Sequence, residues 1–171
     1  MTKFNTNIEA NILRCLKDEV AQLCVTLGNV PFKTGDTRDP LKEEDEDECI
    51  QFRLDTIRRL KQRTGDYYSV VGYEIHCWSK RGDLRTDEKT DRHILLACAV
   101  DAHFHELDLP IYDVVGGNSK TFLGNLQANE STWHFRDKRN TVFGSAVDYS
   151  LETPTTNQTV VVVSGLFIRG A

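Results

Sequence analysis

The sequence lacks the features that mark membrane-spanning and secreted chains. None of its apolar runs approaches the roughly 20 residues that a helix needs to cross a bilayer. The first residues, Met1–Asn5, contain no apolar core of the kind that a signal peptide carries. We therefore expect synthesis in a cytoplasm and no membrane partner.

Cysteine is sparse, with five residues that are odd in number and far apart in the chain. None of them forms a C-x-x-C pair, the spacing on which many cysteine-based zinc sites are built. We interpret them as small hydrophobic residues of the core or its edge: Cys15, Cys24, Cys49, Cys77 and Cys98.

Motifs for catalysis and phosphate binding are missing as well. Gly116-Gly117-Asn118 predicts a turn, because no G-x-x-x-x-G-K pattern follows a strand, and no G-x-S-x-G elbow is present. His103 and His105 would share a face in a strand, but the surrounding pattern is helical. Residues two apart on a helix point in nearly opposite directions. We therefore predict no catalytic residue, no cofactor and no metal.

Charge is distributed unevenly along the chain. The net charge is −5, and removing the six negative charges of one acidic run leaves +1 for the remainder. Proteins that bind nucleic acid strongly usually carry an excess of basic residues. This chain has none, so strong binding to nucleic acid is not expected. The acidic run consists of Glu43, Glu44, Asp45, Glu46, Asp47 and Glu48, and a basic cluster follows it: Arg58, Arg59, Lys61 and Arg63.

The acidic run has two interpretations. It is a solvated loop, or it is a charged arm that orders against a basic surface of a partner. In the second case the basic cluster is that surface on a neighbouring copy, or it faces DNA phosphates that pass through a ring.

Two segments show the period of amphipathic helices. Residues 7–27 carry leucine and valine at spacings of three and four, and Thr6 and Glu9 form a capping box at the start of this segment. Gly28 stands where a left-handed C-terminal cap is expected. A second helix is expected from Thr86 to Leu107.

Two hairpins are expected. Cys49–Arg63 and Ser69–Ser79 form the first, with apolar residues at alternate positions. Cys49–Arg63 also fits a helical stripe, and we prefer the strand because a turn and a strand follow. Trp133–Arg136 and Phe143–Leu151 form the second. Val160–Ile168 is either a buried strand or a strand that pairs outside its own domain.

These elements predict a single α+β domain over residues 1–171. Its mixed or antiparallel β-sheet is built from two hairpins and covered by two α-helices. A long acidic loop is expected at 33–48, and a C-terminal extension at 154–171.

Two segments carry a resemblance to a known family. Tyr73–Trp78, followed by a helix with Leu95-Leu96, is similar to a central strand and its covering helix. Trp133–Arg139, followed by Phe143–Leu151, is similar to a last strand pair. With the overall order of elements, they resemble the tail terminator proteins of long-tailed bacteriophages, such as that of phage lambda. The acidic run and the segment beyond Pro154 depart from the family pattern.

The resemblance implies a structural virion protein of the phage tail or neck, without catalysis and assembled in the host cytoplasm. Six copies would form a ring that terminates the tail tube and offers a surface for head joining. The implied partners are other copies of the chain, the tail tube protein and head–tail connector or neck proteins. DNA would pass through the ring lumen without sequence-specific contacts.

Other interpretations stay open beside this one. The chain is another neck protein, such as a head-closure or tail-completion protein, or a small cytoplasmic metal-dependent enzyme that uses its histidines. For assembly, an apolar edge formed by Leu166, Phe167 and Ile168 would invite pairing with a neighbour. These three residues, the acidic run and the basic cluster are the candidate contact residues.

Overall fold

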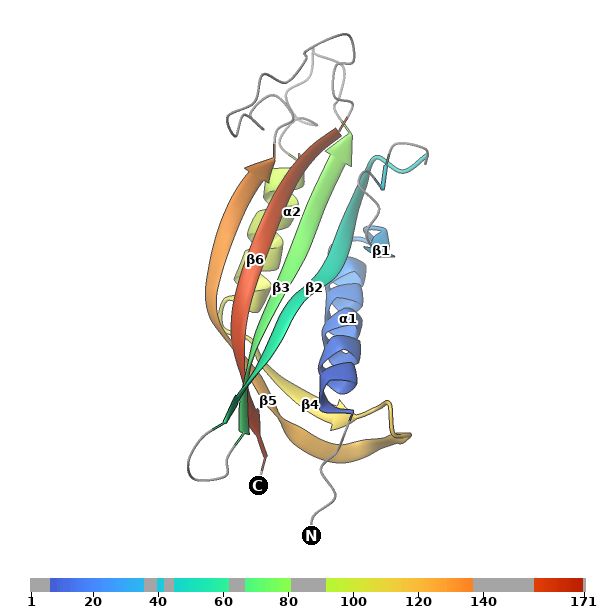
Figure 1. Ribbon diagram of the computed structural model, residues 1–171. Helices are drawn as coiled ribbons and strands as arrows, with labels where there is room; N and C mark the ends of the chain where they lie inside the picture. The colour runs from blue at the N-terminus through green and yellow to red at the C-terminus, as the bar shows by residue number, and fades with distance from the viewer. Residues whose placement is uncertain are drawn as a thin grey trace.

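The computed structural model describes residues 7–35, 40–41, 45–61, 67–80, 92–136 and 156–170. Over these residues, one curled six-stranded mixed sheet carries two helices, which confirms the predicted α+β class (Figure 1). The strand order is β1-β2-β3-β6-β5-β4, with only β1 and β2 parallel. The elements are α1 (Ile8–Thr26), β1 (Phe32–Thr34), β2 (Glu48–Lys61), β3 (Tyr67–Lys80), α2 (Arg92–Phe104), β4 (Asp108–Asp113), β5 (Asn118–Arg136) and β6 (Thr156–Arg169).

Helix α1 lies within one residue of its predicted bounds at each end. Its stripe of Leu16, Val20 and Leu23 is buried against the sheet, because spacings of three and four place these side chains on one face. Gly28 follows with a φ of 96°, as expected after a helix end. The capping-box residue Thr6 lies outside the described residues, and the N-cap Asn7 makes no side-chain cap bond.

The strands of the first hairpin are present, so the strand interpretation of Cys49–Arg63 is confirmed as far as Lys61, where the described residues end. β2 pairs antiparallel with β3, with Ile50 opposite Cys77 and Phe52 opposite Ile75. The alternate side chains of β3 from Val71 to Cys77 are buried and face the helices. The turn expected at 64–66 lies outside the described part of the chain.

Helix α2 is shorter than predicted among the residues that the structure describes. Its first described residue is Arg92, because residues 86–91 are not described. It ends at Phe104 and not at the predicted Leu107. The correction has a clear cause: the Leu107 carbonyl accepts a hydrogen bond from the Ala128 amide of β5, so the chain has already left the helix. Phe104 closes the core by packing edge-on against Tyr73, with ring centroids 5.8 Å apart.

The structure contains a hairpin that the sequence did not predict. β4 and β5 form it, with the predicted Gly116-Gly117 turn between them. Trp133–Arg136 pairs with β6, where Trp133 is opposite Val161. The partner strand predicted at 143–151 falls in a part of the chain that is not described.

The last segment of the chain is the central strand of the sheet. β6 pairs antiparallel with β3 on one side and β5 on the other, so Val160–Ile168 is the buried strand of the two alternatives. Residues 156–169, expected in a C-terminal extension, thus join the two hairpins. On β6 the core-facing side chains Val161, Val163 and Phe167 are buried, and the alternate side chains Val162, Leu166 and Ile168 on the other face are half-buried.

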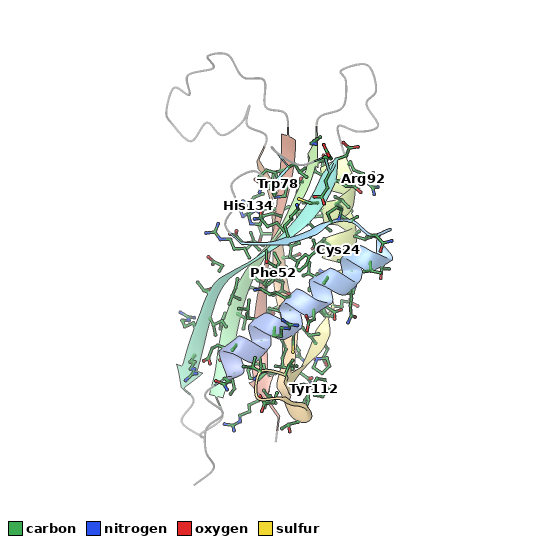
Figure 2. All side chains as sticks on the ribbon, turned by 90° about the vertical axis from the view of Figure 1, so that its right-hand side faces the viewer. Cys24, Phe52, Trp78, Arg92, Tyr112 and His134 are labelled. Carbon is green, nitrogen blue, oxygen red and sulfur yellow. The ribbon has the colours of Figure 1, made fainter. Side chains whose placement is uncertain are left out.

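Both helices pack on the same face of the sheet, and the core lies between (Figures 1 and 2). Phe52, Tyr73 and Phe104 are almost fully buried there, and each such side chain contributes about 1.5–3 kcal/mol to stability. We call the opposite side of the sheet the outer face. Among the described residues no helix covers it, and a small cluster of Leu41, Cys49 and Trp78 closes one end.

Candidate assembly surfaces

The described part of the acidic run is held by cations of its own chain. Glu46 forms an ion pair with Lys33 at 2.9 Å, and Glu48 pairs with Arg92 of α2 at 2.6 Å. Asp45 and Asp47 are exposed. Glu43 and Glu44 lie outside the described residues. The end of the run is therefore anchored, and two of its carboxylates stay accessible to a partner.

The basic cluster lies at the other end of β2. Arg58 is exposed, and Arg59 bonds through its guanidinium to Glu9 of α1. Lys61 belongs to β2 but its side chain is not described, and Arg63 lies outside the described residues. Glu48 and Arg58 are separated along the strand by roughly 33 Å, at about 3.3 Å per residue. The described residues of the acidic run and of the basic cluster therefore do not meet within one chain.

The expected apolar edge at Leu166, Phe167 and Ile168 is wrong, because β6 is not an edge strand. Phe167 is buried in the core. Leu166 and Ile168 point to the outer face and are half-buried there. They remain candidate contact residues through that face alone.

An exposed apolar surface that the sequence prediction missed lies at the end of the β4–β5 hairpin. Its residues, between 37% and 50% exposed, define the hairpin tip: Tyr112, Val114, Val115 and Phe122. The Tyr112 and Phe122 rings meet edge to face, with centroids 6.0 Å apart. Two adjacent valines before Gly116-Gly117 were the available signal, since turns between strands are usually polar.

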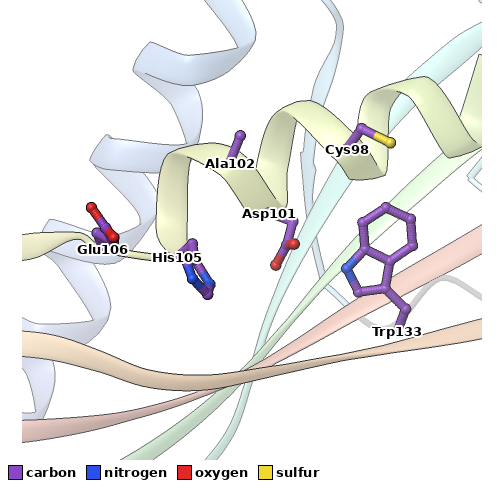
Figure 3. A pocket seen from close by; sticks show the side chains of 6 residues that line it. All are labelled: Cys98, Asp101, Ala102, His105, Glu106 and Trp133. Carbon is purple, nitrogen blue, oxygen red and sulfur yellow. The ribbon is translucent and has the colours of Figure 1, made fainter.

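A groove of about 360 Å³ opens between α2 and the second half of β5 (Figure 3). Two acidic residues, a histidine and three less polar residues line this α2–β5 groove: Cys98, Asp101, Ala102, His105, Glu106 and Trp133. Asp101 accepts a hydrogen bond of 2.5 Å from the Ser131 hydroxyl, which ties the helix to β5 across the groove.

The two histidines of the predicted helix point apart, as helix geometry predicts. His103 donates from Nε2 to Glu19 of α1 at 2.7 Å, whereas His105 lines the α2–β5 groove. Within the described ranges, no group of three or more histidine, cysteine or acidic residues is placed to hold a metal ion. Neither described helix is long and apolar enough to cross a membrane.

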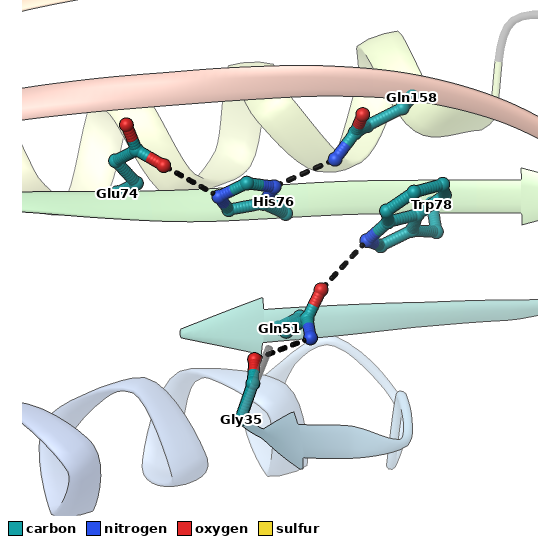
Figure 4. A network of polar contacts seen from close by, with 6 residues as sticks. All are labelled: Gly35, Gln51, Glu74, His76, Trp78 and Gln158. Carbon is teal, nitrogen blue, oxygen red and sulfur yellow. Dashed lines mark hydrogen bonds and ion pairs between the residues drawn. The ribbon is translucent and has the colours of Figure 1, made fainter. Parts of the chain in front are cut away.

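Two polar chains fix the outer face near its covered end (Figure 4). In the first, the Gln51 amide donates to the Gly35 carbonyl at 2.7 Å and accepts from the Trp78 indole at 3.3 Å. This chain holds the segment that follows β1 against the sheet.

The second chain centres on the buried His76. Its Nδ1 accepts from the Gln158 amide at 2.6 Å, and its Nε2 donates to Glu74 at 2.8 Å. The bonds link β3 to β6 and satisfy polar groups that would be costly to bury alone. This end of the outer face is therefore a rigid surface.

The thiols of the core are poor nucleophiles. Burial raises the pKa of Cys24 to about 11 and raises the pKa of Cys77 as well. Because the thiolate is the reactive form, these residues stay protonated and inert near neutral pH. Cys98, on α2, is exposed.

Comparison with known proteins finds a similar fold but no similar sequence. No protein-family model and no curated protein sequence matches the chain. A fold comparison finds a similar chain in a solved structure described as "Virion of native gene transfer agent (GTA) particle". The two chains share 11% sequence identity with a TM-score of 0.52, over 97% of this chain and 100% of that chain. At this identity the likeness concerns the fold, and it spans nearly all of both chains.

Proposed function

We propose that this protein is a structural component of a phage-like virion, where it forms a ring that terminates the tail tube and offers a surface for head joining. The observation that carries the proposal is the fold shared with a chain of a gene transfer agent virion, over 97% of this chain. The resemblance of Tyr73–Trp78 and Trp133–Arg139 to tail terminator proteins supports the finer assignment.

The distribution of charge supports a head-to-tail arrangement of copies. The acidic run and the basic cluster lie at opposite ends of β2, and each keeps exposed charges: Asp45 and Asp47 at one end, Arg58 at the other. A repeated contact between two different surfaces closes into a ring when the rotation allows it. Screened surface charges contribute little affinity, about 0–1 kcal/mol per pair, but they select partners and speed their encounter.

The proposed role needs no catalysis and no cofactor. Its partners are other copies of the chain, six in the family that the sequence resembles, together with the tail tube protein and the head–tail connector. DNA crosses the lumen without base-specific contacts. The proposed location is the neck or tail of the particle.

Deletion of the gene from the phage or particle that encodes it tests the proposal. We expect tails of irregular length that are not joined to filled heads, and complementation with the intact gene restores both defects. Tails of normal length beside unjoined heads would instead indicate a head-closure or tail-completion protein. Unchanged particles, with the chain absent from them by mass spectrometry, would contradict a virion role.

A further inference from the structure

We infer that neighbouring subunits join by pairing an edge of β5 in one copy with an edge of β2 in the next, so that the sheet continues from subunit to subunit. This inference rests on the proposed ring and names the contact that closes it. β2 and β5 lie on opposite sides of the sheet, with β3 and β6 between them (Figure 1). A repeated contact between two different surfaces on opposite sides of a subunit is what a closed ring requires.

Each of the two strands has a stretch that a described strand covers on one side only. β1 pairs with β2 only at residues 50–52, and β4 pairs with β5 only as far as Gln127. Beyond these points, the described part of the chain places β3 beside residues 54–61 of β2, and β6 beside residues 129–132 of β5. We call these stretches the β2 edge and the β5 edge. Strand edges offer backbone N–H and C=O groups to a further strand.

The directions of the strands suit this pairing. β2, β3, β6 and β5 are successive antiparallel neighbours, so β2 and β5 run in opposite directions. A rotation about an axis that runs along the strands keeps the direction of each strand from one copy to the next. The β5 edge therefore meets the β2 edge of the neighbour antiparallel, and the alternation within the subunit continues across the contact.

The two edges also bend at the same level of the sheet. The pairing register shifts at Asp55 in β2 and at Asn129 in β5. The residues that follow these shifts, Thr56 and Glu130, lie in one row across the sheet, through one residue each of β3 and β6. A bulge bends its strand and increases the local twist. Because the two bends lie at one level, the edges of two copies can run side by side.

Side chains of opposite charge lie at this level. Arg58 and Glu130 are exposed on the outer face, and neither forms an ion pair or a hydrogen bond with another described residue. When Thr56 of one copy stands opposite Glu130 of the next, Arg58 occupies the diagonal position, within reach of a long side chain. The carboxylate of Asp55 lies over its own sheet, 3.6 Å from where a Cβ at Gly72 would stand. This charge pairing favours a second copy of the chain as the partner strand.

Oxidative cross-linking tests the contact directly. In a Cys98→Ser background, which removes an exposed thiol, Thr56→Cys and Glu130→Cys together place one thiol on each edge. Within one subunit the two positions are three strand spacings apart, roughly 14 Å, which is too far for a disulfide. We therefore expect mild oxidation to link neighbouring subunits only, in a ladder of covalent oligomers that ends at a closed ring.

Two controls accompany the cross-linking. Each single cysteine variant should form nothing larger than a dimer, because a head-to-tail contact does not bring two copies of one edge together. Val25→Cys combined with Glu130→Cys should give no ladder, since Val25 is 65% exposed but lies on α1 and on neither edge. An equal ladder from this combination would overturn the contact. Rings that assemble from the Thr56→Cys, Glu130→Cys protein without a ladder would overturn the contact but leave the ring.

A charge swap gives a second test that does not depend on thiols. Arg58→Glu or Glu130→Arg alone should weaken self-association about three- to tenfold in analytical ultracentrifugation, because each change sets like charges beside one another. The two changes combined should recover most of this loss. A combined variant that is weaker than either single one would overturn the contact. A wild-type chain that stays monomeric at every concentration and on purified tails would overturn the ring as well.

Discussion

Arg92 and Glu48 form a two-bonded ion pair that joins the first residue of α2 to the first residue of β2. Arg92 Nε donates to Glu48 Oε2 at 2.6 Å, and its terminal nitrogen donates to Oε1 at 3.2 Å. The hydrogen bond to Glu48 raises the pKa of Arg92. The pair fixes where the acidic run meets the folded domain.

We predict a measurable coupling between these two residues. Arg92→Ala and Glu48→Ala, alone and combined, should give a coupling energy of about 0.5–1 kcal/mol, since the side chains are partly exposed. The Arg14–Asp18 pair on α1 is a control with more exposed partners, and it should couple by at most about 0.5 kcal/mol. Urea denaturation at low and high salt measures both, and equal coupling in the two pairs would contradict the prediction.

Gly124 should be required for the pairing of β5 with β6. It has a φ of 156°, and a Cβ at this position would overlap the Ile168 carbonyl oxygen across the strand pair. Gly124→Ala should therefore lower the free energy of unfolding by roughly 2–5 kcal/mol. Gly117→Ala is the control, because Gly117 also has a positive φ but open space around it, and should cost only about 1–2 kcal/mol. Thermal unfolding that ranks the two variants in the reverse order would contradict this account.

Stability should fall in alkaline solution because core groups must stay protonated. Burial raises the Cys24 pKa from 9.0 to about 11, so the stabilisation is full below pH 9 and is lost as the pH rises to 11. Burial also raises the pKa of Cys77 and of Tyr73, in the same direction. Cys24→Ala should remove about 2–3 kcal/mol of this pH-dependent loss, as measured by urea denaturation at several pH values. A Cys24→Ala variant that loses as much stability as the wild type between pH 9 and pH 11 would contradict this account.

The two histidines at the end of α2 should have unequal effects. His103→Ala removes the bond to Glu19 between the helices and should cost about 1 kcal/mol. His105→Ala, at an exposed position, should be nearly neutral, and the double variant should still assemble. Stoichiometric zinc in the purified protein that disappears in the double variant would show that a metal site had been missed.

Local patterns predicted the first half of the fold well. The leucine spacing of α1 and the alternation from Val71 to Cys77 each reflect one buried face, and a single face is visible in sequence. Trp78 is apolar although it lies on the outer face of the sheet. The structure explains this, because Leu41 packs against it there.

The rest depends on contacts between distant segments. Nothing in the periodicity of Val160–Ile168 says that its neighbours are β3 and β5, because pairing partners are chosen by the whole sheet. The strand β4 is short and contains Pro110, so it shows no alternation long enough to recognise. Among the candidate contact residues, the charges were visible in sequence, but the hairpin tip and the groove needed the fold.

The position of β6 has a consequence for synthesis. Because β6 follows every other described strand in the chain and lies between β3 and β5, a ribosome completes both hairpins before it makes the strand that unites them. Until then each hairpin presents an unpaired edge, a state that favours aggregation and needs a slow, non-local closing step. Prematurely terminated chains would therefore fail to fold, and only chains translated through β6 would complete the sheet.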